Sequence, residues 1–413
     1  MKEKVYVGMD LAKGSSKVAV VDGEGNSLLR PFSITNSKDG IKEVLSKLHS
    51  YKTGQILFGM EISSNYWENM YSYLKEKDIL CILLNPYQVK KYRQAIGSKI
   101  KTDAIDATSI AELIRGRRYG SIYISDEVVL ELRELVRIKL SFGRRVKDLK
   151  KSVLSLLYVV FPEYTKIVSY PFSKVSMDIL TRFPTAVHMA KDASVSKLVK
   201  IFRRYQGCNY SVDKAKELIA IAKDSFYSGR AYRSRGMTIS MQIEEIASLS
   251  GKIKQIENEI KSILTPDDPG GGLSSFGILN SIKGVGIGTI AAFLAAVGDV
   301  SRFSSSDKLI SYIGFYPRIF ESGKYRRKSP TIQKAGPKEL RYMLYLASVA
   351  SIKHNSQLKK YYYDKVSAGM PAKKALIKVA VKLARMMYSM LKHKTCYDSS
   401  RVFLQSLPLK DAA

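Results

Sequence analysis

Val5-Tyr-Val-Gly-Met-Asp10 is an apolar run that ends in a carboxylate, near the start of a chain of 413 residues. Ile56-Leu-Phe-Gly-Met-Glu61 repeats the same pattern further along. Short apolar runs of this kind are typical of buried strands, and ligand sites in open α/β sheets lie at strand ends. The two stretches therefore predict two strands of an α/β sheet, each carrying a functional acid at its end.

Two further acids, Asp103 and Asp106, lie in Lys101-Thr-Asp-Ala-Ile-Asp-Ala107, which opens a helical pattern. Residues three apart share a helix face, with Cβ atoms about 5–6 Å apart. Carboxylates this close repel one another unless a cation neutralises them, and oxygen ligands suit Mg²⁺ or Mn²⁺. Together with Asp10 and Glu61, the pair predicts a two-metal phosphoryl-transfer site. The alternative for each acid alone is a solvated strand end or, for Asp103, a helix cap.

The segments around these acids alternate between strand and helix patterns over the first 125 residues. Lys17–Val21 is another short apolar run, and Asp22-Gly-Glu-Gly-Asn26 after it predicts a hairpin turn. The next expected elements are helices over Ile41–His49 and Asn65–Lys77 and a strand over Ile79–Leu84, stopped by Asn85-Pro86. A hairpin followed by this alternation implies a mixed sheet flanked by helices, which fits an RNase H-like fold.

The composition indicates a polyanionic partner. The chain holds 68 Lys and Arg against 37 Asp and Glu, a net charge of +31, which is typical of nucleic-acid binding. From Gly323 to Lys394 there are 18 basic residues, opposed by Glu339 and Asp364 alone. Three scattered cysteines fit neither a disulfide framework nor a zinc site, and four scattered histidines offer no obvious acid–base pair. Without a signal peptide or a long apolar stretch, we expect a cytoplasmic protein with no membrane partner.

Long helical patterns occupy the middle of the chain. Glu127–Val160 keeps apolar residues at spacings of three and four, as in a heptad seam, and a second seam runs over Ile246–Ile263. The two seams predict either an antiparallel helical hairpin or a dimeric coiled coil. Arg137, Arg144 and Lys151 recur every seven residues on another face. This basic stripe is either a solvated face or a nucleic-acid contact, and residues 164–227 are expected to be helical without an assigned role.

A glycine-rich linker, Thr265–Gly272, is expected to precede a mainly helical carboxy-terminal domain. We therefore expect domains at residues 1–125, 126–265 and 273–400. Ile282-Lys-Gly-Val-Gly-Ile-Gly-Thr289 resembles a helix-hairpin-helix, in which Gly284 and Gly286 permit a tight turn. Backbone N–H groups at the start of the following helix can bind a DNA phosphate. The alternative is an ordinary turn.

Several motifs, taken in order and spacing, carry a resemblance to a known family. These motifs are Gly8–Lys13, Met60–Trp67, Asn85-Pro86, Lys101–Ala107, Gly314–Pro317, Ser322-Gly323, Lys334–Gly336 and Leu340-Arg341. The chain resembles the DEDD-type transposases of bacterial insertion sequences, recombinases with a RuvC-like amino-terminal domain that are guided by a bridge RNA. The resemblance covers nearly all of the chain. One departure is Pro337, where the family usually has Asn.

The resemblance implies a mechanism with a covalent intermediate. In this family a carboxy-terminal serine attacks a DNA phosphodiester and holds the strand as a phosphoserine ester, and the family's Ser-Gly motif falls on Ser322-Gly323. Serine is a weak nucleophile that needs activation, which the metal or a carboxylate of the acidic site would supply. Without the resemblance, Ser322 would be read as part of an ordinary turn. The basic residues expected to contact nucleic acid or stabilise the attacked phosphate are Lys324, Arg326, Arg327, Lys328, Lys334 and Arg341.

The resemblance also implies the partners of the protein: donor and target DNA, a guide RNA, and further copies of the chain in a dimer or tetramer. Two other functions are consistent with the residues. One is a RuvC-like nuclease that hydrolyses DNA with two metals and no covalent serine intermediate. The other is a non-catalytic, basic nucleic-acid-binding scaffold whose acidic site has decayed, although the presence of all four acids argues against decay.

Overall fold

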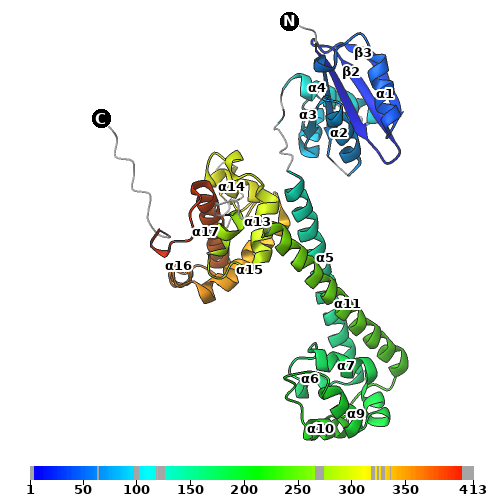
Figure 1. Cartoon of the computed structure of the whole chain (residues 1–413), viewed down its shortest axis with the longest axis vertical. Coiled ribbons are helices and arrows are strands. Elements are labelled where there is room, and N and C mark those ends of the chain that lie inside the picture. The colour runs from blue at the N-terminus through cyan, green and yellow to red at the C-terminus, as the bar shows by residue number, and fades with distance from the viewer. Residues whose placement is uncertain are drawn as a thin grey trace. The chain divides into compact units, whose positions relative to one another are not determined.

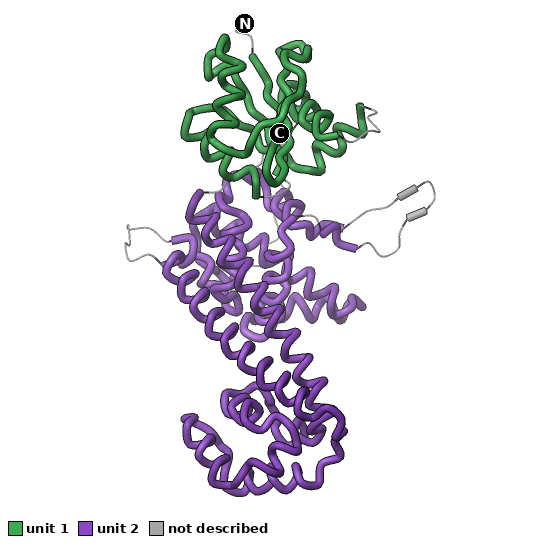
Figure 2. Tube along the Cα trace, turned by 90° about the vertical axis from the view of Figure 1, so that its right-hand side faces the viewer, with its two compact units in different colours: residues 1–124 green, residues 125–413 purple. Residues whose placement is uncertain are grey.

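The computed structural model describes residues 4–62, 65–96, 102–117, 119, 126–265, 274–317, 321–322, 325–326, 331–334 and 336–401, with 321, 322, 325, 326 and 401 described as backbone. The chain divides into two compact units, residues 1–124 and 125–413 (Figure 1; Figure 2). The second unit includes both the helical region expected from residue 126 and the expected carboxy-terminal domain. Residues 266–272 of the expected linker lie outside the described residues.

The first unit is built on a five-stranded mixed sheet with the strand order β3-β2-β1-β4-β5. The strands are β1 (Val5–Leu11), β2 (Ser15–Val21), β3 (Ser27–Thr35), β4 (Ile56–Glu61) and β5 (Leu80–Leu84). β2 is antiparallel to β1 and β3, whereas β4 is parallel to β1 and β5. The expected mixed sheet is therefore confirmed.

The edge strand β3 is an element that the sequence pattern did not predict. Its side chains are mostly exposed, so it lacks the apolar run that marks the other strands. It also contains Pro31, a residue that argues against a central strand because it cannot donate to the ladder. At the edge of a sheet the missing N–H group can be tolerated, which is where β3 lies.

One face of the sheet is covered by α1 (Lys38–Lys47) and α2 (Tyr66–Glu76). Alternate side chains of a strand point to opposite faces, and in β1 and β4 the buried set that includes Val7 and Phe58 packs with these helices. The helix α1 begins at Lys38, before the expected Ile41, because the Ser37 hydroxyl accepts the Gly40 N–H at 3.2 Å.

The other face is covered by α3 (Pro86–Ala95) and α4 (Asp103–Arg115). Asn85 and Pro86 were expected only to end the preceding strand. The Asn85 side chain accepts the Tyr87 N–H at 2.9 Å and caps α3, while Pro86 occupies the first turn, where a missing N–H group is harmless. The same two residues therefore stop β5 and start a helix.

The second unit contains a pair of long helices, α5 (Glu127–Val160) and α11 (Tyr232–Leu264), which pack against each other. Two cross-helix ion pairs join them, Lys139–Glu257 at 2.9 Å and Arg145–Glu245 at 2.6 Å. Because the partners follow opposite orders along the two helices, the helices are antiparallel. Of the two alternatives for the seams, this chain thus forms the intramolecular hairpin. The helix expected over Glu127–Val160 is confirmed.

Five short helices follow α5 and occupy most of the segment that the sequence left without a role. They are α6 (Tyr164–Ile167), α7 (Lys174–Arg182), α8 (Ala186–Asp192), α9 (Val195–Phe202) and α10 (Val212–Lys223). They share a hydrophobic core with the adjoining ends of α5 and α11. Within that core the hydroxyl of Tyr164 lies 2.8 Å from that of Ser176, which satisfies two buried polar groups.

A second helical lobe follows α11 and shares its core with the opposite ends of the hairpin helices. Its elements are α12 (Ser275–Asn280), α13 (Ile287–Val297), α14 (Ser306–Ile313), β6 (Glu321–Ser322), β7 (Tyr325–Arg326), α15 (Lys338–His354), α16 (Ser356–Ser367) and α17 (Ala372–His393). α13 is apolar apart from Thr289 and is largely buried, as expected for a helix without a polar face. None of the helices in the described residues has an apolar stretch long enough to cross a membrane.

Candidate functional site

Two of the predicted acids lie at the carboxyl ends of neighbouring strands. β1 and β4 are paired in parallel up to Met9↔Met60. β1 continues through Asp10 to Leu11, and β4 continues by one residue, to Glu61. Adjacent strands lie about 4.8 Å apart, so the two backbones bring these acids side by side. Both residues are half-buried. The structure therefore unites two residues that the sequence separates by some fifty positions.

Close packing of α4 shows which face these acids occupy. Side chains two residues apart share a face of a strand, so Asp10 lies on the face of Gly8 and Glu61 on that of Gly59. A Cβ atom on Gly8 would lie 2.0 Å from the Ala107 carbonyl oxygen, and one on Gly59 would lie 2.9 Å from a side chain of the same helix. At Gly8 only glycine permits this approach, because the atom it would meet belongs to the backbone of α4. Asp10 and Glu61 consequently belong to the α4 side of the sheet.

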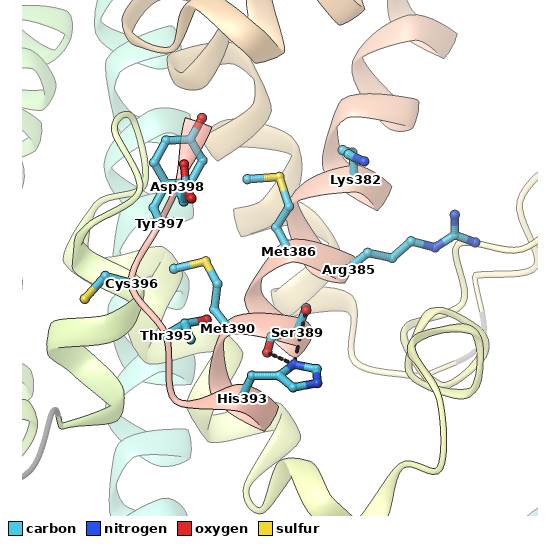
Figure 3. A pocket seen from close by; sticks show the side chains of 10 residues that line it. All are labelled: Lys382, Arg385, Met386, Ser389, Met390, His393, Thr395, Cys396, Tyr397 and Asp398. Atoms are coloured by element: carbon cyan, nitrogen blue, oxygen red, sulfur yellow. Dashed lines mark hydrogen bonds between the residues drawn. The ribbon is translucent and has the colours of Figure 1, made fainter. Parts of the chain in front are cut away.

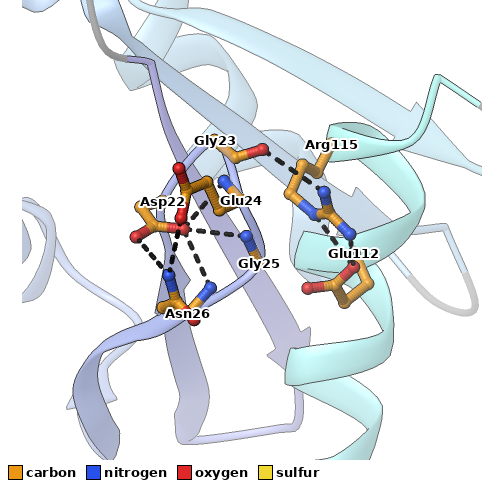
Figure 4. A network of polar contacts seen from close by, with 7 residues as sticks. All are labelled: Asp22, Gly23, Glu24, Gly25, Asn26, Glu112 and Arg115. Carbon is orange, nitrogen blue, oxygen red and sulfur yellow. Dashed lines mark hydrogen bonds and ion pairs between the residues drawn. The ribbon is translucent and has the colours of Figure 1, made fainter.

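The far end of α4 is tied to the turn between β2 and β3 (Figure 4). Arg115 Nη1 donates to the carbonyl oxygen of Gly23 at 3.3 Å, and its Nη2 donates to Glu112 at 2.7 Å. Because β2 runs antiparallel to β1, this turn lies at the end of the sheet opposite the strand-end acids. The helix α4 therefore places its first turn, with Asp103 and Asp106, toward the end that carries those acids.

The turn itself is rigidly built around one carboxylate. Asp22 Oδ1 accepts the backbone N–H groups of Glu24, Gly25 and Asn26 at 2.8–2.9 Å (Figure 4). Desolvation raises the pKa of Asp22, but these hydrogen bonds and that of the Asn26 side chain outweigh it and lower the pKa. The turn expected over residues 22–26 is confirmed, and it anchors the helix that carries two of the predicted acids.

The two acids of α4 have different surroundings. Thr102, rather than Asp103, caps the helix, since its hydroxyl accepts the Ile105 N–H at 3.3 Å. Asp103 is then the exposed first residue of α4, whereas Asp106 is only 6% exposed. The Asp106 carboxylate accepts from Arg93 Nη1 of α3 at 2.5 Å. In this conformation Asp106 is neutralised by a guanidinium that sequence reasoning did not identify.

The described residues do not form a complete metal cage. No group of three or more His, Cys, Asp or Glu side chains within the described ranges lies close enough together to hold a metal ion. The strand ends and the first turn of α4 nevertheless direct Asp10, Glu61 and Asp103 to one end of the sheet, and carboxylate oxygens are the donors that Mg²⁺ prefers. The chemistry of the donor set thus fits a hard divalent cation.

The predicted nucleophile lies in the second unit. Ser322 belongs to the two-residue strand β6, which pairs with β7 through Glu321↔Arg326. The chain on either side of this hairpin is joined by an antiparallel bridge, Pro317↔Ile332. We call residues 314–317 and 331–334 the stalk. Of the neighbouring predicted residues, Gly323, Lys324, Arg327 and Lys328 lie outside the described ones.

Lys334 and Arg341, both predicted to contact nucleic acid, differ in their roles. Arg341 Nη1 donates to the carbonyl oxygens of Ile313 and Gly336 at 2.8 and 2.9 Å, and burial lowers the pKa of its guanidinium. Arg341 therefore holds the turn before α15 in place. Lys334 is exposed at the end of the stalk, with its backbone N–H donating to the Gly314 carbonyl oxygen at 3.1 Å.

The glycine turn of the expected helix-hairpin-helix lies between α12 and α13, and its two glycines differ. Gly284 has a φ of +89°, and a Cβ atom there would lie 2.6 Å from Ser351 Cα, so this glycine packs against α15. Gly286 is the exposed N-terminal cap of α13, with nothing within 4 Å of its Cβ position. Phosphate binding at this turn stays a prediction, and Gly286 is the part of it that faces solvent.

Basic residues from two distant segments line one groove of about 750 Å³ in the second unit. The lining residues, which we call the basic groove, are Arg137, Ile138, Ser141, Arg144, Lys334, Gly336, Pro337, Lys338, Glu339 and Arg341. The α5 stripe and the carboxy-terminal basic motif were separate features of the sequence. The fold joins Arg137 and Arg144 of that stripe to Lys334 and Arg341.

A separate pocket of about 410 Å³ lies along the last turns of α17 (Figure 3). Ser389 and His393 line it with Oγ and Nδ1 3.4 Å apart, an arrangement that invites comparison with a nucleophile and its base. The His393 Nδ1 atom also lies 2.9 Å from the Ser389 carbonyl oxygen, which can only accept. Nδ1 must therefore carry a proton and cannot take one from the serine, so the pair is not a catalytic dyad.

Two family models match the chain. A DEDD transposase model of the IS110 type matches residues 7–162, and a model described as "Transposase IS116/IS110/IS902 family" matches residues 277–363. Together they cover more than half of the chain. The four predicted acids lie within the first match, and Ser322 lies within the second.

Related proteins agree with this assignment. A protein of insertion element IS116 from Streptomyces clavuligerus is 22% identical over 100% of this chain and 99% of its own length. The pilin gene-inverting protein of Moraxella bovis is 21% identical over 96% and 98%. The transposase for insertion sequence element IS1533 of Leptospira borgpetersenii is 33% identical over 37% of this chain and 44% of its own length. The chain belongs to the IS110/IS116 family of insertion-element transposases.

Proposed function

We propose that the protein is a recombinase of an insertion sequence, which cuts and joins DNA strands with a divalent metal held by its acids and with Ser322 as nucleophile. One observation carries the proposal: Asp10, Glu61 and the first turn of α4 all lie toward the same end of the sheet. The chain also belongs to this transposase family. The strand order and directions of the sheet also support the RNase H-like, RuvC-like fold that the resemblance implies.

Asp10, Glu61 and Asp103 would hold Mg²⁺ or Mn²⁺. A bound ion of this kind neutralises negative charge on phosphate oxygens during phosphoryl transfer. Asp106 can join the donor set once its carboxylate separates from Arg93. Until then the buried Arg93–Asp106 pair keeps this acid neutralised, which reduces the mutual repulsion of the four carboxylates.

Ser322 would act as the covalent nucleophile. Its Oγ atom forms a bond to the DNA phosphorus while the bond from phosphorus to one strand end breaks. The hydroxyl proton passes to a base, and the departing strand oxygen takes up a proton. Since one phosphate ester replaces another, a strand hydroxyl can later attack the phosphoserine and join a new strand. Such an intermediate accounts for cutting and joining without an external energy source.

The partners follow from charge and from family resemblance. A net charge of +31 supports binding of nucleic acid, and the family supports DNA as substrate. We propose a guide RNA and a homo-oligomer, dimer or tetramer, on the strength of the resemblance. Salt-dependent binding of RNA transcribed from the flanks of the gene would test the guide, and sedimentation of the assembled complex would test the oligomer.

A covalent-trapping experiment tests the mechanism. A nicked DNA substrate, which loses its departing strand, is incubated with Mg²⁺ and wild-type protein, Ser322→Ala, Asp10→Ala or the control Ser304→Ala. We expect a denaturation-resistant adduct, mapped to Ser322, with wild type and control only. Cleavage by Ser322→Ala without an adduct would favour the two-metal nuclease. DNA binding by wild type without any cleavage would favour the non-catalytic scaffold.

A further inference from the structure

We propose that the basic groove holds the phosphates of the DNA strand that Ser322 attacks, with Arg144 and Lys334 as the principal contacts. This inference rests on the proposed function and adds the path of the strand across the second unit. It joins a helix face and a carboxy-terminal motif that lie nearly two hundred residues apart in the sequence.

The charge of the groove fits a polyanion. It is lined by five cationic side chains and one carboxylate, that of Glu339. Arg341 is committed to backbone carbonyl groups, and Arg137 forms an exposed ion pair with Glu134 at 2.7 Å, an interaction of little stability in water. Lys338 forms an ion pair with Glu339 at 3.8 Å, and within the described part of the chain Arg144 and Lys334 have no ion-pair partner. They are therefore the charges most available to phosphates.

The spacing of the cations fits a phosphate backbone. Arg137 and Arg144 lie two helical turns apart on α5, about 10.5 Å along the helix axis. One strand of duplex DNA advances about 3.4 Å per phosphate, so the two arginines span about three steps of a strand. Lys334 and Lys338 line the same groove from the carboxy-terminal segment and can contact the same strand.

The groove adjoins the segment that carries the nucleophile. Lys334 ends the stalk, whose two sides are joined by hydrogen bonds from Gln333 N–H to the Tyr316 carbonyl oxygen at 3.0 Å and from Lys334 N–H to Gly314 at 3.1 Å. Lys334 thus belongs both to the stalk below the Ser322 hairpin and to the lining of the groove. A strand held there lies at the base of the reactive segment, which favours substrate DNA over another polyanion.

The first test measures binding without chemistry. All variants are made in a Ser322→Ala background, and affinity for a DNA duplex containing the cleavage site is measured over a range of salt concentrations. For Arg144→Gln combined with Lys334→Gln, we expect the slope of log affinity against log salt to become shallower by about two, one per lost phosphate contact. Arg145→Gln is the matched control, because Arg145 is adjacent, similarly exposed and paired with Glu245 on the other helix.

The second test locates the strand. Single phosphates around the cleavage site are replaced by uncharged methylphosphonates. Neutralising a phosphate bound in the groove should weaken binding by the parent protein but add little in the double variant, since the contact is already lost. Additive losses at every position would overturn the inference, and so would an unchanged slope or an equal effect of Arg145→Gln. Loss of binding to guide RNA alone would assign the groove to RNA.

These outcomes are independent of the trapping experiment. Absence of an adduct on Ser322 would overturn the proposed mechanism while leaving the binding slopes to report on the groove. A normal adduct together with unchanged slopes would overturn the groove alone.

Discussion

The two regions proposed to act in one reaction hold their functional groups in different ways. Asp10 and Glu61 lie at the carboxyl ends of strands of a five-stranded sheet, on a face where α4 approaches the backbone at Gly8. Ser322 lies in a two-residue strand between the two halves of the stalk. The chain just after the stalk is held by the hydrogen bond from Arg341 to the Gly336 carbonyl oxygen. In the first region the positions of the acids follow from the packing of regular elements, whereas in the second the position of Ser322 depends on a turn. Each region nevertheless relies on glycine in close contact with a neighbouring backbone, at Gly8 in the first and at Gly336 in the second.

The largest effect is expected from Gly8→Ala. A Cβ atom there would lie 2.0 Å from the Ala107 carbonyl oxygen, so α4 must move away from β1, and overpacking of this kind costs about 3 kcal/mol. Trp67, the single tryptophan, lies in the first unit and reports its unfolding in urea by fluorescence. Gly14→Ala is the control, because nothing lies within 4 Å of that position. Equal stability of the two variants would contradict close packing at Gly8.

In the second region, Gly336→Ala should have a somewhat smaller effect, because Gly336 lies in a turn, which can shift more easily than the packed helix α4. Gly336 has a φ of +83°, and its Cβ atom would lie 1.9 Å from the Tyr312 carbonyl oxygen. Conformational strain and overlap together should lower the free energy of unfolding by about 2–3 kcal/mol. Gly369→Ala has nearly the same φ, +81°, without any close neighbour, and should show only the strain, about 1 kcal/mol.

Circular dichroism at 222 nm follows this unfolding, because the second unit is mainly helical, while Trp67 fluorescence follows the first. We expect the tryptophan transition to be unchanged in both variants. If Gly336→Ala were no less stable than Gly369→Ala, the turn at the root of the stalk would not be fixed by contact with α14.

The same contrast explains how far the sequence could predict the molecule. Asp10 and Glu61 follow apolar runs that predict strands directly, and the i,i+3 spacing of Asp103 and Asp106 predicts a shared helix face. Local patterns therefore suffice for the acidic site. Ser322 is surrounded by no comparable pattern, and only the family resemblance distinguishes it from an ordinary turn.

The sequence alone does not predict which residues far apart along the chain come into contact. The periodicity of α3 gives no sign that Arg93 reaches Asp106, because the contact depends on how α3 and α4 pack on the same face of the sheet. For the same reason the sequence gives no sign that the stripe on α5 and the motif at Lys334 line one groove. A buried acid is usually paired with an opposite charge. Burial of Asp106 is therefore the signal that points to a cation nearby.

Arg93→Gln tests the acidic site itself. The ion pair with Asp106 is largely buried, with side chains 17% and 9% exposed, and loss of a hydrogen bond to a charged group costs about 2 kcal/mol. Because Asp106 is then free to bind a cation, Mg²⁺ should stabilise this variant more than wild type. Thermal unfolding with and without Mg²⁺ measures both effects. A variant that loses stability yet gains no response to Mg²⁺ would show that Asp106 is not a ligand.

Arg137→Gln should have the smallest effect on stability, and it completes the comparison because it also removes an arginine from an ion pair. Arg137 and Glu134 are 57% and 61% exposed, and pairs of this kind contribute less than about 1 kcal/mol. Urea unfolding of the second unit should therefore match wild type closely. Binding should still change, with a slope of log affinity against log salt for DNA that is shallower by about one.

If Arg137→Gln weakens DNA binding without affecting the fold, the basic groove is a surface for a partner, whereas Arg93 is part of the folded core. Loss of stability comparable to that of Arg93→Gln, with an unchanged salt slope, would reverse that distinction.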